Sequence, residues 1–423
     1  MNPNLFQEDS GDEEFMGIMS DCVDLLEKGE TSGRPRIPHT VIRRDRETAD
    51  EQLMADYFVK DAKYTLWYFR RRFRMLRPLF MRIVNDILSY PSRHPGHVPE
   101  HFRRMQDKLL DGRKRVGFST IKKCVSAIRQ LAYGYNPGAL DDYLQIGEGT
   151  SRVYLDHYSK CVFQLYKEEY LRRPTPEDID RLYDKYEELH GFPRMLGSID
   201  CMHWPWKNCP KAWQGQYTRG DHDHPTIMLE AVASYDLWIW HAYFGTAGSN
   251  NDINVLNNSP VFREIIEDRA QDSSFKVNGT HYRKWYYLRS SQCLLSRTHA
   301  RKKKRRKKFK QYQESARKDV ERAFRSLQNQ WHILTQPARA KSINRICRTK
   351  YACVILHNMI VEGSSHTIST LEEDGLIQPP TFQRTFEERM AVHERTNKEL
   401  RDRHVHHALR HDLTEHILRL PSS

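Results

Sequence analysis

The first part of the chain, between residues 46 and 170, places apolar residues at helical spacing. Phe69, Phe73, Leu76, Phe80 and Ile83 follow one another at intervals of three and four residues, which puts them on one side of a helix. The polar side of the same segment carries arginines at positions 70, 71, 72, 74 and 77. This arginine face is either the solvated side of a core helix or a surface that contacts phosphate.

A second amphipathic pattern covers residues 118–133, and two short helical segments follow at 139–144 and 151–165. A glycine-containing turn joins them, and Thr150 or Ser151 is the expected N-cap of the second segment. The pair resembles a helix-turn-helix, whose second helix reads DNA. Short helix pairs also occur for purely structural reasons, so both interpretations stand.

After residue 192 the pattern changes to apolar segments of strand length. It predicts strands at 195–200, 229–235, 238–244 and 284–288, and helices at 254–266 and 313–334. Asp236 and Leu237 are expected to join the second and third strands as a hairpin. This order of elements is typical of an RNase-H-like core. The predicted fold class is therefore α/β: an RNase-H-like nuclease core preceded by an all-α, helix-turn-helix-like domain.

The charge of the chain narrows the choice of partner. Lys and Arg outnumber Asp and Glu by 68 to 55, which gives a formal net charge of +13 and favours a polyanion such as DNA. The eight cysteines form no CxxC pair, which fits a reducing compartment. No apolar run approaches the roughly 20 residues that span a bilayer. We therefore expect no membrane partner.

Residues 301–310 contain nine Lys or Arg. Such a run indicates a nuclear localisation signal or a phosphate-binding loop, and its alternative is a merely solvated loop. The predicted organisation has four parts: a disordered acidic tail and linker (1–40), a helical DNA-associated domain (41–190), an RNase-H-like nuclease domain (191–365) and a C-terminal helical tail (366–423). The basic run is a predicted insertion within the nuclease domain. The predicted localisation is the nucleus.

Three acidic residues fall where phosphodiester chemistry with two divalent ions requires hard oxygen ligands. Asp200 is expected at the end of the first strand, Asp252 in the loop after the third strand, and Glu321 on the late helix. A lone aspartate at a strand end is more often structural, and Asp252 has a second interpretation as a helix N-cap. Their order along the chain favours a catalytic, metal-binding set for Mg²⁺ or Mn²⁺.

Several motifs appear in this order: GSIDCMHW (197–204), WKNCP (206–210), GSNNDINVL (248–256), KDVERAF (318–324) and ACVILHNMIVE (352–362). Together they resemble the plant PIF/Harbinger transposase-derived proteins of the DDE superfamily, over about residues 43–418. The resemblance implies an RNase-H-like endonuclease domain that cuts and joins DNA with divalent metal. It also implies nuclear residence and commonly a Myb-like partner that supplies DNA binding. Asp200, Asp252 and Glu321 match the acidic positions of the family.

The chain departs from the family after the fourth predicted strand. Where members continue with an Ala-Asp-Gly-like stretch, this chain has Arg289, Ser290 and Ser291. Serine does not replace an anionic ligand, and Arg289 adds positive charge. The stretch 289–300 is either a feature of this protein or the product of a frameshift or of mis-splicing, which resequencing the transcript would test. A smaller departure is Arg325, in place of the usual glycine, which is expected to crowd the helix against the sheet.

Three classes of function follow from these residues. The first is a transposase-like nuclease that acts on DNA with divalent metal and is impaired by the missing acid near Ser290. The second is a domesticated, non-catalytic nuclear DNA- or protein-binding factor. The third is a protein-interaction module that uses a helix at 381–420 and binds no DNA.

Overall fold

A computed structural model of the chain describes residues 42, 44–93, 117–220, 223–250, 255, 259–262, 274–282, 286–289, 300–364 and 403–420. The chain divides into two compact units. The helical unit takes its described residues from Met1–Tyr166, Trp206–Pro210 and Gln330–Cys353. The sheet unit takes them from Lys167–Pro205, Lys211–Asn329 and Val354–Ser423. None of the described helices combines the length and the apolar character that crossing a bilayer requires.

The helical unit begins with three helices around a cluster of aromatic rings. Its elements are α2 (Arg46–Tyr57), α3 (Leu66–Phe73), α4 (Arg77–Arg93), α6 (Thr120–Tyr133), η2 (Pro137–Leu140), α7 (Asp141–Leu144), the first part of α8 (Glu148–Tyr170), η4 (His332–Thr335) and the first part of α14 (Ile343–Ser364). The rings of Phe69 and Phe73 lie 4.4 Å apart, and Phe80 lies 5.4 Å from Phe73. Among the described residues the helical pattern predicted for 46–170 is confirmed. Of its apolar stripe Phe69, Phe73, Phe80 and Ile83 are buried, whereas Leu76 is exposed.

The predicted N-cap of the second helix-turn-helix segment is wrong. Helix α8 begins at Glu148, so Thr150 and Ser151 lie inside its first turn. The hydroxyl of Ser151 is buried and lies 2.6 Å from that of Ser126 on α6. The segment before the turn forms the end of η2 and the four-residue helix α7. Ser151 therefore joins two helices of the core instead of capping one.

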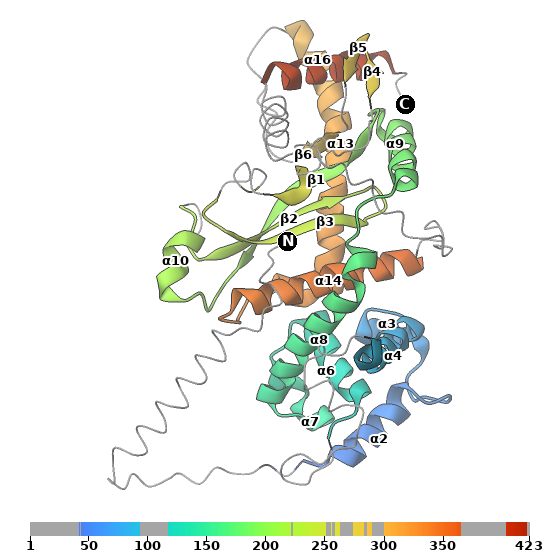
Figure 1. Ribbon diagram of the computed structural model, residues 1–423, viewed down its shortest axis with the longest axis vertical. Helices are drawn as coiled ribbons and strands as arrows, with labels where there is room; N and C mark the ends of the chain where they lie inside the picture. Colours follow the sequence, from blue (N-terminus) through green and yellow to red (C-terminus); the bar gives the residue numbers. More distant parts are fainter. Residues whose placement is uncertain are drawn as a thin grey trace. The chain divides into compact units, whose positions relative to one another are not determined.

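The sheet unit is built on a four-stranded sheet with the order β3-β2-β1-β6 (Figure 1). Its strands are β1 (Met195–Pro205), β2 (Thr226–Ala233), β3 (Ile239–Ala247) and β6 (Tyr286–Arg289). The strands β1, β2 and β3 pair antiparallel, whereas β1 pairs with β6 in parallel. This mixed sheet and its helices confirm the α/β class, and the β2–β3 hairpin confirms the predicted turn at Asp236 and Leu237.

Helices surround this sheet. They are α9 (Pro176–His190), α10 (Lys211–Tyr217), α13 (Ala300–Gln330), the ends of α8 and α14, and α16 (Arg403–Arg419), with the short elements η3 (Pro260–Phe262), β4 (Phe275–Val277) and β5 (Thr280–Tyr282). Helix α13 starts 13 residues earlier than predicted, so the basic run 301–310 forms its first turns. Of the predicted helix 254–266, Val255 is helical and Pro260–Phe262 form η3, and the other positions lie outside the described residues.

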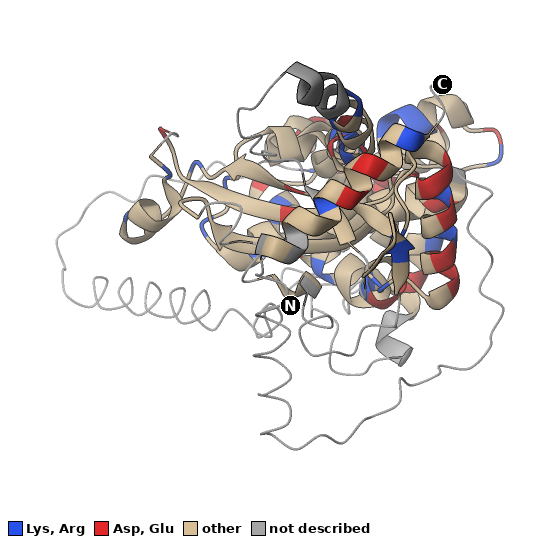
Figure 2. Cartoon of the chain, turned by 90° about the horizontal axis from the view of Figure 1, so that it is seen from above, with Lys and Arg blue, Asp and Glu red and all other residues tan. Residues whose placement is uncertain are grey.

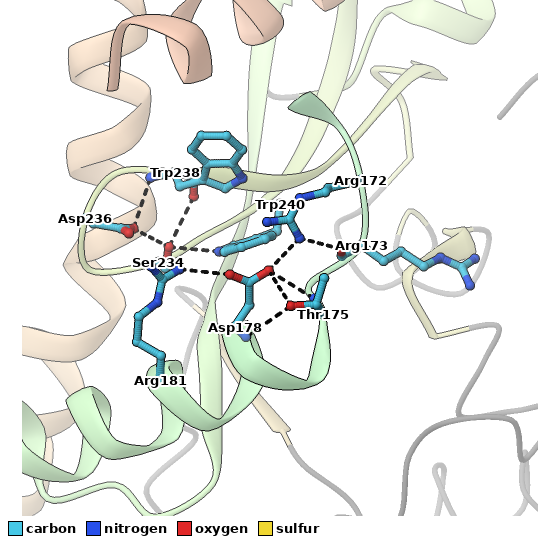
Figure 3. A network of polar contacts seen from close by, with 9 residues as sticks. All are labelled: Arg172, Arg173, Thr175, Asp178, Arg181, Ser234, Asp236, Trp238 and Trp240. Atoms are coloured by element: carbon cyan, nitrogen blue, oxygen red, sulfur yellow. Dashed lines mark hydrogen bonds and ion pairs between the residues drawn. The ribbon is translucent and has the colours of Figure 1, made fainter. Parts of the chain in front are cut away.

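Polar contacts gather at the start of α9 and at the β2–β3 hairpin, and Arg172 links the two groups (Figure 3). Thr175 and Asp178 form a capping box. The Asp178 carboxylate also forms ion pairs with Arg172, at 2.5 Å, and with Arg181, at 3.1 Å. The guanidinium of Arg172 in turn lies over the ring of Trp240, 5.4 Å from its centre. Burial opposes the charge of Asp178, but the hydrogen bonds from Arg172 and the Thr175 backbone lower its pKa below the usual value.

Helix α16 packs its apolar side within the sheet unit, where Leu413 and Ile417 are buried. Its Asp412 binds the β4–β5 hairpin by accepting hydrogen bonds from Tyr282 (2.7 Å) and Asn278 (3.2 Å). Asn278 and Gly279 form the turn of this hairpin with φ of 51° and 90°. The Asn-Gly pair is a strong hairpin signal that the strand prediction overlooked. Leu413 and Ile417 are thus engaged within the chain, and of the interaction helix expected at 381–420, residues 381–402 lie outside the described residues.

We expect Asp412→Asn to loosen α16 from the β4–β5 hairpin by roughly 2 kcal/mol, because hydrogen bonds to a charged group are lost. Burial opposes the charge of Asp412, but hydrogen bonds from Tyr282, Thr280 and Asn278 outweigh it and lower its pKa to about 2. A lowered pKa stabilises the fold above the unfolded value of about 4, and the stabilisation disappears as the pH falls toward 2. Hydrogen exchange of residues 274–282 measures the effect, and exchange in Asp412→Asn equal to the wild type at pH 7 would contradict it.

Candidate functional site

The three long strands of the sheet are almost free of charged residues, and most charges lie on helices and loops (Figure 2). The only acidic residues within β1, β2 and β3 are Asp200 and Glu230. A carboxylate in a central strand needs a partner, because an uncompensated buried charge is costly. The surroundings of these two residues therefore decide what each one does.

Asp200 lies in the middle of β1, not at its end as predicted. The strand continues to Pro205 because β2 pairs with it along its whole second half. The pairing with β6, however, stops at Ile199 opposite Arg289, one residue before Asp200. Asp200 is half-buried. It is the first residue of β1 beyond the described pairing with β6.

The strand register places Asp200 and Glu230 on opposite faces of the sheet. Asp200 pairs with Ala231 and Cys201 pairs with Glu230, and directly paired residues share a face while successive residues alternate. Asp200 therefore shares its face with Ser198 and Met202. Both of these neighbours contact α13, which identifies the face of Asp200 as the one that α13 covers.

Two contacts fix α13 along β1 on either side of Asp200. The Ser198 hydroxyl accepts a hydrogen bond of 2.9 Å from the Val320 backbone N–H, and Gln328 Nε2 lies 3.2 Å from Met202 Sδ. From 198 to 202 the strand advances about 13 Å. From 320 to 328 the helix advances about 12 Å. Because the two rises match, α13 runs in the same direction as β1.

Glu321 lies on this stretch of α13, one residue after Val320. It precedes Gln328 by seven residues, so the two share a side of the helix. The level of Asp200 corresponds to residue 324, which places Glu321 about 5 Å away along the helix axis. The carboxylate of Glu321 is half-buried, and Arg317 Nη2 lies 3.9 Å from it. The structure thus brings the elements of Asp200 and Glu321 together, with a cation beside the second acid.

Asp319, in the same motif, is an acid whose role the sequence did not indicate. It is fully buried, accepts a 3.1 Å hydrogen bond from Tyr186 on α9 and forms an ion pair with Arg322. The His190 Nε2 atom lies 4.0 Å away, and burial lowers the pKa of this histidine despite the carboxylate. Asp319 therefore joins α13 to α9. Arg325 is exposed, so the expected crowding of the sheet by its side chain is wrong.

Asp252 and Ser290 lie outside the described residues. The loop that leads to Asp252 is described up to Asn250. Its first residue, Gly248, lies close to the backbone of Thr226. A Cβ on Gly248 would lie 1.9 Å from Thr226 Oγ1 and 2.5 Å from the Thr226 carbonyl oxygen. Only glycine fits this position, where the Gly248 N–H donates to the Thr226 carbonyl at 2.9 Å. This contact explains the glycine of the GSNND motif.

Glu230, on the opposite face, is held by structural partners. It is fully buried, and Ser259 donates a hydrogen bond of 2.6 Å to it while His241 Nε2 lies at 3.5 Å. Burial lowers the pKa of His241 to about 4, so this histidine is neutral near pH 7. The cluster was not predicted, because neither its strand positions nor its spacing resembles a known motif.

Two polar residues inside the apolar helix α14 were also overlooked as structural residues. Asn358 is fully buried and binds both the N–H and the carbonyl of Ile239 on β3, at 3.0 and 2.9 Å. His357 Nε2 lies 2.9 Å from the Leu237 carbonyl oxygen, and burial lowers its pKa to about 4. A His-Asn pair within the run ACVILHNMIVE was the available signal, since buried polar residues require partners.

Two tryptophans that closely follow Asp200 pack inside the protein. Trp204 and Trp206 are buried, and Trp206 Nε1 donates a hydrogen bond of 2.8 Å to the Ala340 carbonyl within the helical unit. Asn208 of the same WKNCP motif donates to Arg339 at 2.6 Å. This motif therefore fastens one stretch of backbone to another, and it offers no ring for stacking on DNA.

The donors around Asp200 are of the right chemical kind for Mg²⁺ or Mn²⁺, which prefer carboxylate oxygen. They do not form a complete set. Within the part of the chain that the structure describes, no group of three His, Cys, Asp or Glu residues converges to hold a metal ion. Asp200 and Glu321 would supply two ligands.

Residues 168–368, which include β1, α13 and the Asn358 helix, match the family model described as plant transposon protein. This match supports a plant transposase-derived protein. The motifs had indicated this family, and the match together with the relatives below confirms the prediction. A second model, described only as a domain of unknown function, matches residues 50–88 of the transposase-derived chain.

Two relatives from Arabidopsis thaliana agree with this family. One is the protein named antagonist of like heterochromatin protein 1, which is 21% identical over 334 residues that cover 72% of this chain and 75% of the relative. The other, a protein named ALP1-like, is 26% identical over 210 residues, which cover 46% of this chain and 49% of that relative. No solved structure matches the chain.

Proposed function

We propose that this transposase-derived protein retains an RNase-H-like nuclease core whose metal-dependent cleavage of DNA is impaired. The observation that carries the proposal is the pair of contacts, Ser198 with Val320 and Met202 with Gln328, that hold α13 along β1 on both sides of Asp200. Such a frame keeps Asp200 and Glu321 on facing elements, as inherited ligands of a divalent cation would require.

The strand order supports the RNase-H-like assignment. In that fold three antiparallel strands are followed by a strand that pairs in parallel with the first, and β3-β2-β1-β6 has this arrangement. Asp252 remains the third member of the proposed set, in the loop after β3. The bound metal would activate water and stabilise the leaving oxygen. Asp200 and Glu321 would orient it, and Arg317 would compete with it for Glu321.

The impairment follows from the residues after β6. The parallel strand leads to Arg289 opposite Ile199, beside Asp200, and the next residue is Ser290 in place of an acid. A neutral hydroxyl holds a divalent cation far less well than a carboxylate. We propose that this loss misplaces the metal, and a misplacement of about 1 Å can cost roughly 100-fold in rate.

We expect the purified full chain to nick supercoiled DNA weakly or not at all with Mg²⁺ or Mn²⁺. Asp200→Ala is the matched control, because it removes the central acid of the proposed site. Both proteins should differ little from each other and from a protein-free reaction in a plasmid-relaxation assay. Robust metal-dependent nicking by the wild type that Asp200→Ala abolishes would contradict the impairment while supporting the nuclease assignment.

A second candidate function is that of a non-catalytic nuclear factor that binds DNA or protein. The specific observation in its favour is the absence of an acid at Ser290 in an otherwise well-packed core. One relative is named as an antagonist of a heterochromatin protein, which fits a chromatin role for this chain as well. DNA, a Myb-like protein and the nucleus remain the proposed partners and place of action.

A further inference from the structure

We propose that the helical unit binds single-stranded nucleic acid on a strip of alternating aromatic rings and arginines along α3 and the end of α6. The aromatic–arginine strip consists of Trp67, Arg70, Arg71, Arg74, Tyr133 and Tyr135. This inference goes beyond the nuclease-like function, because the strip belongs to a different unit from Asp200 and Glu321 and requires no metal.

The strip exists because α3 is amphipathic in an unusual way. Phe69 and Phe73 point into the core at 1% and 0% exposure. Trp67, Arg70, Arg71 and Arg74 recur at intervals of three, one and three residues, which places them on the other side. Trp67 keeps 61% of its surface exposed although burying an indole ring stabilises a fold. An exposed ring of this size among arginines indicates a surface for a ligand.

The rings and guanidinium groups of the strip lie next to one another in space. Arg71 lies over the Trp67 ring, 5.4 Å from its centre, and Arg74 lies 5.3 Å from the centre of Tyr133. The Tyr133 hydroxyl donates to the Arg71 carbonyl at 3.3 Å, and Tyr133 stacks on Tyr135 with 5.0 Å between ring centres. Tyr135 is 50% exposed. Two exposed rings thus flank a group of cations.

The positive charge of the strip lacks a compensating acid. Elsewhere in the helical unit arginines have carboxylate partners: Arg44 pairs with Asp141 and Arg348 with Asp156. Among the described residues no acidic side chain forms an ion pair with Arg70, Arg71 or Arg74. Residues 59–77 contain seven basic residues and one acidic residue. This local excess matches a ligand that carries regularly spaced negative charge.

A buried arginine beneath the strip points the same way. Arg129 on α6 is 8% exposed, and its guanidinium lies 5.6 Å from the centre of the Tyr133 ring. The Nε atoms of both Arg129 and Arg74 are buried without a hydrogen-bond partner among the described residues. Buried N–H groups are rarely left without an acceptor, so these two donors add uncompensated positive charge next to the Tyr133 ring.

The combination favours single-stranded nucleic acid over a duplex or an acidic protein segment. A duplex hides its base faces, so it offers the Trp67 and Tyr135 rings nothing to stack on, whereas unpaired bases stack on aromatic residues while arginines bind the backbone. An acidic protein segment would satisfy the cations but would gain less from flat, exposed rings. Single-stranded DNA and RNA share the recognised chemistry, and the experiment distinguishes them.

The test measures binding of fluorescent oligothymidylate and oligouridylate to the full chain in EDTA, by anisotropy at several salt concentrations. Trp67→Ala should weaken binding by about 10-fold or more, because a stacked base is lost. Arg70→Ala with Arg71→Ala should lower the slope of log affinity against log salt by about 1.4, or 0.7 for each phosphate contact. Binding of one or both oligonucleotides with these changes supports the proposal and identifies the sugar that is preferred.

Matched controls lie on the same unit. Leu66→Ala shortens an apolar side chain that is 65% exposed beside Trp67, and Arg152→Ala removes an arginine that already pairs with Glu148. Neither should change affinity more than about twofold. Duplex DNA or polyglutamate bound as tightly as oligothymidylate, or binding indifferent to Trp67→Ala, would overturn the proposal. Because the measurement is made in EDTA, it requires no metal at the proposed nuclease site, and failure of the nuclease proposal leaves this result intact.

Discussion

Replacing Asn358 with leucine is expected to destabilise the sheet unit by about 4 kcal/mol. The Asn358 side chain satisfies three buried backbone groups: the N–H and carbonyl of Ile239 at 3.0 and 2.9 Å, and the Tyr170 carbonyl at 2.8 Å. Leucine fills the same space but leaves all three without a partner, at a cost of about 1–3 kcal/mol each. Hydrogen exchange of residues 226–247 measures the loss, because Asn358 holds the edge strand β3.

The matched control is Asn329→Leu, which makes the same substitution at an exposed position of α13. It should change stability by no more than about 0.5 kcal/mol, as surface substitutions usually do. A loss below about 1 kcal/mol in Asn358→Leu would mean that water or a shift of β3 replaces these hydrogen bonds. The hydrogen bonds of Asn358 would then contribute little to the stability of the fold.

Asn358 also shows what the sequence was able to reveal. The strands β1, β2, β3 and β6 and the helices α6 and α13 were predictable, because each places apolar residues at the period of its own secondary structure. The hydrogen bonds between Asn358 and β3 were not predictable in detail. A polar residue in an apolar helix indicates that a partner exists, but the partner Ile239 lies 119 residues away in the chain. Only the folded arrangement identifies it.

Boundaries were missed for a related reason. Asp200 was expected to end its strand because charged residues usually stop an apolar run, yet β2 pairs with β1 as far as Pro205. Ser151 was expected at an N-cap from local sequence, and its contact with Ser126 carries it into the core. In both cases a partner distant in the sequence outweighs the local preference. The same limit hid the Asp319–Tyr186 contact, which joins residues 133 positions apart.

Replacing Ser290 with aspartate should raise metal-dependent nicking by about 100-fold or more. The substitution returns a carboxylate to the residue after β6, whose last member lies opposite Ile199 and therefore beside Asp200. A hard anionic ligand there would tighten divalent-ion binding and correct the position of the metal. Plasmid nicking and a Mn²⁺ titration followed by paramagnetic resonance give independent readouts.

Ser291→Asp is the control that separates position from charge. It adds the same negative charge one residue further along, where a chain continuing the strand would turn the side chain to the other face. Ser290→Asp should therefore bind Mn²⁺ more tightly than Ser291→Asp, and Asp200→Ala should abolish the restored nicking. Equal behaviour of the two aspartate variants would show that the missing acid does not limit this site. The loss of activity would then lie in the frame that β1 and α13 form around Asp200, and the non-catalytic function would become the better account of the chain.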